Sequence, residues 1–148
     1  MKTLILGVGN LLLKDEGVGI HVIRALEKEN MPSGVDLLDG GTGGFHLISW
    51  LEEYERIIMV DATLDNNPPG TVRVIRPKYA SDFPPLMSAH EIGLRDMLEI
   101  MQLTDKMPEV HLIVVSAVDI SEVGMDLTPE VENSIPKVIE YVKTIIKR

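Results

Sequence analysis

Cysteine is absent from this chain of 148 residues. Its absence excludes disulfide bonds, thiolate metal ligands and cysteine nucleophiles, and it is compatible with a reducing cytoplasm, which we expect as the location. Aromatic residues are scarce at 4%, so leucine, isoleucine, valine and methionine must fill the core. The sequence also lacks any apolar run of about eighteen residues, and we therefore expect no membrane-spanning helix.

Basic residues are outnumbered by acidic ones. Lysine and arginine together count 14 against 23 aspartates and glutamates, which gives a net charge of −9. Such a surface repels the phosphates of nucleic acids and of anionic membranes, so we expect neither as a partner. The length suffices for one hydrophobic core and is short for two, and we expect a single domain over residues 1–148.

Short apolar runs alternate with helical patterns along the chain. Four runs have the length of buried strands, at residues 3–8, 35–39, 57–61 and 110–118, whereas residues 71–76 alternate apolar and polar side chains as an edge strand does. Apolar spacing predicts helices over residues 17–29, around 47–51, around 94–101 and over 130–147, the last beginning after an N-cap at Thr128. This alternation indicates an α/β sandwich with a mainly parallel sheet.

Acidic residues follow two of the predicted strands. Asp15 and Glu16 lie in the loop after the first strand, and Asp61 closes the third. In open α/β sheets, ligands bind beyond the carboxyl ends of the strands, where the strand order reverses. If the order runs 2-1-3, these acids share one crevice. Each also has a structural interpretation, because acids are favoured at a helix N-terminus and can cap a turn.

His90 precedes a predicted helix in the segment SAHEIGL. A lone histidine is more often a surface or capping residue than a ligand, and the other histidines are expected to be structural: His21, His46 and His111. Together with Glu16 and Asp61, however, His90 would supply a mixed oxygen and nitrogen donor set. Such a set suits nickel or zinc better than magnesium or calcium.

Other catalytic and binding motifs are incomplete. Gly7 and Gly9 begin a dinucleotide fingerprint, but Leu12 occupies the position of its third glycine, and no Walker loop is present. The His-Glu-x-x-His and Gly-x-Ser-x-Gly patterns are also missing. Residues 39–43, Asp-Gly-Gly-Thr-Gly, do not match the signature of pepsin-like proteases and would serve structurally as a glycine-rich turn held by Asp39.

Five motifs, in this order, resemble the hydrogenase maturation endopeptidases over residues 3 to about 140. They are Gly7-Val8-Gly9-Asn10 with Asp15-Glu16-Gly17-Val18-Gly19, then Asp39-Gly40-Gly41-Thr42-Gly43, Val60-Asp61-Ala62, Ser88-Ala89-His90-Glu91-Ile92-Gly93-Leu94 and Leu127-Thr128-Pro129-Glu130-Val131. One departure follows the last predicted strand, where Ser116-Ala117-Val118-Asp119-Ile120 lacks the Gly and Pro of the usual turn. This departure bears on which large subunit is recognised.

The resemblance implies a fold and an activity. The fold would be a three-layer, phosphorylase/hydrolase-like sandwich with a twisted five-stranded sheet flanked by helices. The activity would be removal of a C-terminal extension from the precursor of a nickel–iron hydrogenase large subunit, after nickel has been inserted. The resemblance maps nickel recognition onto Glu16, Asp61 and His90, and it links Asp39 to activity.

The chemistry of the cleavage stays open between an aspartic-type and a metal-dependent peptidase. Either Asp39 or Asp61 would act as general base toward the attacking water. We expect nickel to arrive with the precursor and not as a resident cofactor, and we expect a monomer. Two alternatives from other classes are a non-catalytic nickel-sensing module and a nucleotide-binding α/β module.

Overall fold

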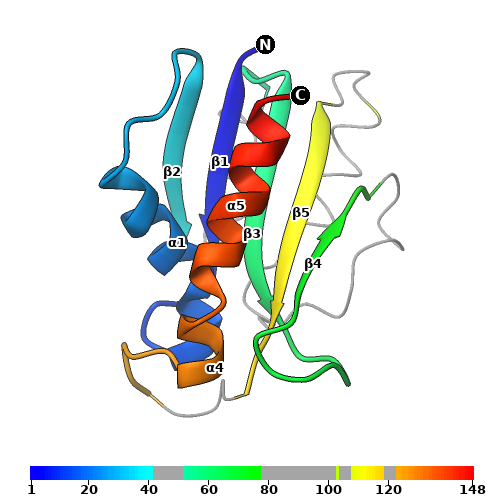
Figure 1. Ribbon diagram of the computed structural model, residues 1–148. Helices are drawn as coiled ribbons and strands as arrows, with labels where there is room; N and C mark the ends of the chain where they lie inside the picture. Colours follow the sequence, from blue (N-terminus) through cyan, green and yellow to red (C-terminus); the bar gives the residue numbers. More distant parts are fainter. Residues whose placement is uncertain (42–51, 78–102, 104–107, 119–122) are drawn as a thin grey trace.

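The centre of the protein is a five-stranded sheet with the strand order β2-β1-β3-β5-β4 (Figure 1). The strands are β1 Thr3–Val8, β2 Val35–Gly41, β3 Arg56–Thr63, β4 Val72–Ile75 and β5 Glu109–Ser116. The helical elements are η1 Lys14–Gly17, α1 Val18–Glu27, α4 Pro129–Glu132 and α5 Ile135–Ile146. This computed structural model describes residues 1–41, 52–77, 103, 108–118 and 123–148. The helices predicted around residues 47–51 and 94–101, with His46 and His90, lie outside these ranges.

Four of the strands are parallel, and only β4 is antiparallel to its neighbour, β5. The α/β fold with a mainly parallel five-stranded sheet is therefore confirmed. The strand predicted to lie at an edge is also confirmed, since β4 ends the sheet. Among the described residues, no helix combines the length and the apolar character needed to cross a membrane.

The inner strands are apolar on both faces because both faces are buried. Side chains alternate between the faces, so that Ile58 and Ile113 pack in one cluster with helices α1 and α5, whereas Met59 and Leu112 belong to a second cluster. Figure 1 shows α1 and α5 crossing the same side of the sheet. This packing fixes β1 and β3 side by side, with their carboxyl ends at one edge.

The prediction of one closing helix over residues 130–147 is wrong. The segment forms two helices, α4 and α5, with Asn133 and Ser134 between them. The break follows from Pro136, which has no backbone N–H to donate to the carbonyl of Glu132 and so cannot continue an α-helical ladder. The chain turns at Ser134, whose hydroxyl donates to the carbonyl of Val131 over 2.5 Å.

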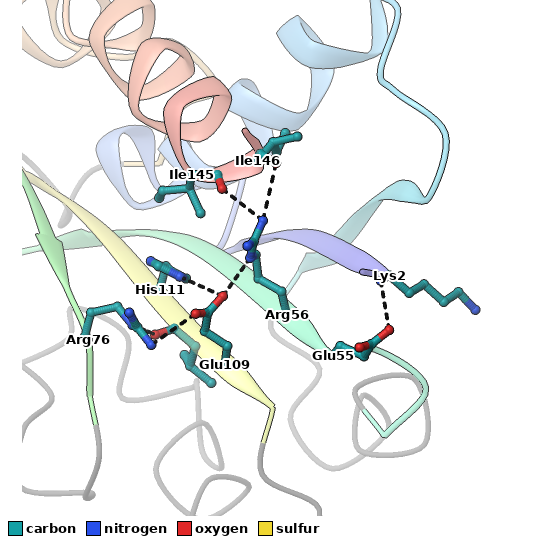
Figure 2. A network of polar contacts seen from close by, with 9 residues as sticks. Lys2, Glu55, Arg56, Arg76, Glu109, His111, Ile145 and Ile146 are labelled. Atoms are coloured by element: carbon teal, nitrogen blue, oxygen red, sulfur yellow. Dashed lines mark hydrogen bonds and ion pairs between the residues drawn. The ribbon is translucent and has the colours of Figure 1, made fainter. Parts of the chain in front are cut away.

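A network of polar contacts ties the C-terminal helix to the amino-terminal edge of the sheet (Figure 2). Arg56, which is 5% exposed, donates from Nε to Glu109 Oε2 over 2.7 Å and from Nη1 to the carbonyl of Ile145 over 2.9 Å. His111 Nε2 lies 3.3 Å from the same Glu109 oxygen, and Arg76 Nη2 lies 3.5 Å from Oε1. One carboxylate thus joins β3, β5 and the residue after β4, and Arg56 extends the network to α5.

Two members of this network, His111 and Glu109, have shifted pKa values. Burial lowers the pKa of His111 from its ordinary value of 6.5, and this effect outweighs the opposing attraction of Glu109. The hydrogen bond from Arg56 lowers the pKa of Glu109, although burial opposes it. The folded protein therefore favours neutral His111 beside a charged carboxylate that Arg56 already neutralises.

We expect the protein to lose stability as the pH falls below about 6.5, and His111 to cause part of this loss. Between the lowered pKa and the ordinary value, the unfolded chain binds a proton at His111 that the folded protein does not bind, so the free energy of unfolding rises with pH in this window. Urea unfolding of wild type and His111→Gln, at about pH 5.5 and about pH 7.5, checks this. The variant should show a smaller difference between the two pH values, and an equal difference would contradict the assignment.

Candidate functional site

The strand order reverses between β1 and β3. The chain steps from β1 to β2 on one side and places β3 on the other side, which is the order 2-1-3 on which the shared crevice depends. The one-turn helix η1 follows β1 and packs against β3. Ligands of such sheets bind beyond the carboxyl ends of strands at this kind of reversal. Glu16 on η1 and Asp61 on β3 are therefore placed at the switch point.

Gly9 shows how closely these elements approach. It has φ +134°, and a Cβ atom at this position would lie 1.9 Å from the carbonyl oxygen of Glu16 and 3.8 Å from Oδ1 of Asp61. Gly9 thus lies between the backbone of Glu16 and the side chain of Asp61. Both acids are buried, with 2% of Glu16 and none of Asp61 exposed. A buried carboxylate is costly to maintain, and such groups are typical of functional sites.

We expect Gly9→Ala to lower the free energy of unfolding by about 2–6 kcal/mol, because positive-φ strain and an overpacked contact add together. Gly34→Ala is a matched control, since Gly34 has φ +86° but its Cβ would meet nothing closer than a carbonyl oxygen at 3.7 Å. Chemical denaturation of both variants separates the two terms. Equal losses in the two variants would show that Gly9 tolerates a side chain at this contact.

Two further glycines of the opening motif have packing roles. A Cβ on Gly7 would lie 2.3 Å from the carbonyl oxygen of Gly19, and one on Gly19 would lie 2.3 Å from that of Val60. Helix α1 can therefore approach β1 and β3 only because both residues lack side chains. Packing therefore explains why glycine occupies these two positions, and no bound nucleotide is needed to explain it. This weakens the nucleotide-binding alternative.

The segment that leads to Glu16 is hydrogen-bonded to Gly124, which is distant in sequence. The backbone N–H of Lys14 donates to the carbonyl of Gly124 over 2.8 Å, and Gly124 donates to Leu12 over 2.7 Å. Lys14 adopts φ 44°, a left-handed conformation that is uncommon for a residue with a side chain. Such a conformation persists where the surrounding contacts impose it, and it is frequent at functional sites.

Asp61 lies inside β3, so the prediction that the third strand ends at Asp61 is wrong. The strand continues to Thr63 because Ala62 and Thr63 remain paired with Val115 and Ser116 of β5. Within the strand, Asp61 Oδ1 accepts a hydrogen bond from the N–H of Ala62 over 2.8 Å. The carboxylate is therefore oriented by rigid backbone.

Asp39 lies in β2, as the strand predicted over residues 35–39 implies, and the strand continues two residues further to Gly41. Asp39 pairs with Gly7 of β1, and its side chain is exposed. Side chains alternate between the two faces along a strand, so Asp39 lies on the same face of the sheet as Leu37. Asp61 lies on the opposite face, with Met59. Two strand spacings separate β2 from β3, about 10 Å. The fold places η1, which carries Glu16, against β3, which carries Asp61, and leaves Asp39 on the other face, directly before the glycine-rich segment.

His90 lies outside the described ranges, and its role as a ligand stays a prediction. In the part of the chain that the structure describes, no three histidine or acidic side chains form a group that could hold a metal ion. The two buried carboxylates would supply the oxygen donors, and an imidazole would complete a set suited to nickel or zinc.

Asp65, beside the site, was not singled out by the sequence. It accepts hydrogen bonds from the Ser116 hydroxyl over 2.9 Å and from the Asn67 N–H over 3.0 Å, and it pairs with Arg73 over 2.7 Å. Burial opposes the charged form of Asp65, but the hydrogen bonds from Asn67 and Ser116 lower its pKa overall. The turn residues that follow it, Asn-Asn-Pro-Pro-Gly, were the available signal for an aspartate that fixes a loop.

The fold and the site define an α/β protein with two buried carboxylates at the switch point of a parallel sheet. A family model described as hydrogenase maturation protease matches residues 20–145. The chain belongs to this family, and the resemblance found in the sequence is confirmed. The protein is accordingly a peptidase of the hydrolase class.

Individual relatives agree with this assignment. The chain is 34% identical over 150 residues to the hydrogenase 2 maturation protease of Escherichia coli (strain K12), covering 99% of this chain and 92% of the relative. It is 32% identical over 150 residues to the hydrogenase expression/formation protein HupD of Bradyrhizobium diazoefficiens, covering 98% and 78%. The solved structure of the hydrogenase maturating endopeptidase HybD from E. coli matches with a TM-score of 0.91 at 34% identity, covering 99% of this chain and 93% of that one. The [NiFe] hydrogenase maturation protease HybD from Thermococcus kodakarensis matches with a TM-score of 0.80 at 32% identity, covering 98% and 99%.

Proposed function

We propose that this protein removes a C-terminal extension from the precursor of a nickel–iron hydrogenase large subunit, and that it does so only after nickel has been inserted. Family membership supports an endopeptidase of hydrogenase maturation. The observation that supports the rest is the burial of Glu16 and Asp61 at the switch point, where the backbone of Glu16 and the Asp61 side chain both approach Gly9. The protein would act as a monomer in the cytoplasm.

Nickel is part of the substrate in this proposal. The two carboxylates, with His90 as the predicted third donor, would complete the coordination of a nickel ion that the precursor already holds. Carboxylate and imidazole donors together suit nickel. Because the donors are fixed on β3 and η1, the bound precursor is oriented by its metal, and the scissile bond is held in one place. Such positioning can account for a large part of the barrier lowering in enzymes.

A carboxylate would serve as general base in the hydrolysis. It takes a proton from the water whose oxygen attacks the peptide carbonyl carbon, and it returns that proton to the leaving amine as the carbon–nitrogen bond breaks. This transfer contributes about 10²–10⁴-fold in rate. Asp61 fits the role better than Asp39, because it shares the switch point with Glu16, whereas Asp39 lies on the opposite face of the sheet.

The proposal is tested by mass spectrometry of a large-subunit precursor, prepared with and without nickel, before and after incubation with the protein. We expect the nickel-loaded precursor to lose its C-terminal extension and the nickel-free precursor to keep its full length. A loaded precursor that binds the protein and stays uncut would overturn the peptidase proposal and favour a nickel-sensing module.

Asp39→Asn is expected to slow cleavage while changing the free energy of unfolding by no more than about 0.5 kcal/mol, since the side chain is exposed. The effect on cleavage would act through the glycine-rich segment that follows Asp39. Asp36→Asn provides a control on the same strand, at its other end, and should cleave at the wild-type rate. Initial rates and melting curves of the two variants decide the matter, and a wild-type rate for Asp39→Asn removes the residue from the mechanism.

A further inference from the structure

The carboxylate of Asp15 is fully buried and joins η1 to two residues that lie 103 and 113 positions later in the sequence. Oδ2 accepts a hydrogen bond from the N–H of Val118 over 2.9 Å, just beyond β5. Oδ1 accepts one from the N–H of Thr128 over 2.8 Å, at the start of α4. The Thr128 hydroxyl also lies 3.0 Å from Oδ1 and 2.9 Å from Oδ2. Both oxygens of Asp15 are therefore engaged by donors from beyond the site.

Thr128 occupies the N-cap of α4 but does not cap it with its side chain. A threonine at this position ordinarily accepts a hydrogen bond from a backbone N–H of the first turn. Here the hydroxyl donates to Asp15 instead, 113 residues away in sequence. Thr128, which the sequence predicts to start a helix, thus also binds the residue that precedes Glu16.

The helix η1 depends on such contacts for its shape. It is a 3₁₀ helix of four residues, Lys14–Gly17, and so short a helix has little stability of its own. Asp15 and Glu16 are consecutive residues within it. A displacement of Asp15 therefore moves the backbone from which the Glu16 side chain departs.

We infer that Asp15 is a positioning residue of the metal-recognition site: by binding Val118 and Thr128 it fixes η1, and with it the Glu16 carboxylate relative to Asp61. The inference rests on the proposed function, in which Glu16 and Asp61 recognise the nickel of the precursor. It makes the segment after β5 and the start of α4 a support of the site, although neither supplies a ligand.

The Asp15→Asn variant tests this role, because the amide keeps the size of the carboxylate but turns a nitrogen toward one of the donors. We expect the rate constant kcat for the nickel-loaded precursor to fall about 10- to 100-fold, as is usual when reacting groups are misplaced slightly. Calorimetric titration of the free protein with nickel should show an affinity about tenfold weaker, or about 1.4 kcal/mol. Both are measured well below the melting temperature, so that loss of folded protein does not contribute.

Two controls separate positioning from stability. Tyr54→Phe removes a hydroxyl that donates to Asp36 over 2.7 Å at the opposite edge of the sheet, and it should lower the melting temperature without changing nickel affinity or kcat. Thr128→Val removes the hydroxyl donor from Asp15 and should weaken both functions, whereas Thr128→Ser keeps the donor and should restore them. This second pair stands even if Asp15→Asn does not fold.

The outcomes are distinguishable. Wild-type nickel affinity and kcat in folded Asp15→Asn, or equal effects of Thr128→Val and Thr128→Ser, would overturn the positioning role while leaving the proposed function intact. If Tyr54→Phe lowers kcat as much as Asp15→Asn does, the loss of kcat follows from lower stability alone, and the positioning role of Asp15 is overturned as well. If the wild-type protein neither cleaves the loaded precursor nor binds nickel, the proposed function fails and this inference fails with it.

Discussion

Asp61→Asn is expected to reduce cleavage of the nickel-loaded precursor by about 10²–10⁴-fold, the range associated with loss of a general acid–base group. The asparagine keeps an oxygen to accept the hydrogen bond from Ala62, so the strand should stay intact. The free energy of unfolding should fall by no more than about 3 kcal/mol, the upper range for a disturbed buried polar group. Activity should thus be lost far out of proportion to stability.

Glu16→Gln should have an effect of the same kind, and both variants should lose the nickel site in calorimetric titration. Asp65→Asn is the matched control, because Asp65 is an acid in the loop after β3 that pairs with Arg73 and accepts a hydrogen bond from the Ser116 hydroxyl. It should lose stability and keep cleavage. Retention by Asp61→Asn of more than about a tenth of the wild-type rate would contradict the assigned role, since a general base typically contributes about 10²–10⁴-fold.

The protein is expected to stay fully active on nickel-loaded precursor after treatment with a chelator and re-purification. Two carboxylates and one predicted imidazole lack the adjacent general base of a His-Glu-x-x-His site, so they resemble a site that recognises a metal held by the substrate more than a resident zinc centre. Nickel-free precursor should not be cut at a measurable rate, whichever metal is added to the protein. Cleavage would then depend on the state of the substrate.

The opposite mechanism gives the opposite result. A resident catalytic zinc requires that the chelated protein be inactive on loaded precursor and recover only when zinc is returned. Inhibitors of serine and cysteine proteases serve as a further control and should have no effect, because the chain has no cysteine and lacks the Gly-x-Ser-x-Gly pattern. Recovery with zinc would show that the protein is a metal-dependent peptidase with a resident zinc ion, and it would exclude the mechanism in which the substrate supplies the metal.

The parts of the fold that the sequence predicted are those governed by local pattern. Runs of buried apolar residues located β1, β3 and β5 within two residues at each end, because strands covered on both faces need such runs. The alternation of apolar and polar residues in β4 indicated an edge strand, because such a strand has one exposed face. The single closing helix was mistaken because apolar spacing continues through Pro136 although the backbone ladder cannot.

The features of the site also divide into those that the sequence predicts and those that only the tertiary structure decides. The sequence by itself determined the family, the acids Glu16 and Asp61 and their place near the switch point, since motif order and strand ends are properties of the chain. Only the tertiary structure decided that Asp39 and Asp61 lie on opposite faces, because a side chain's face depends on strand register and not on a strand's approximate position. It also decided that Asp15 binds Thr128, a contact between residues 113 positions apart that no local pattern records. Hydrogen bonds between distant segments form only when packing brings their donors and acceptors together.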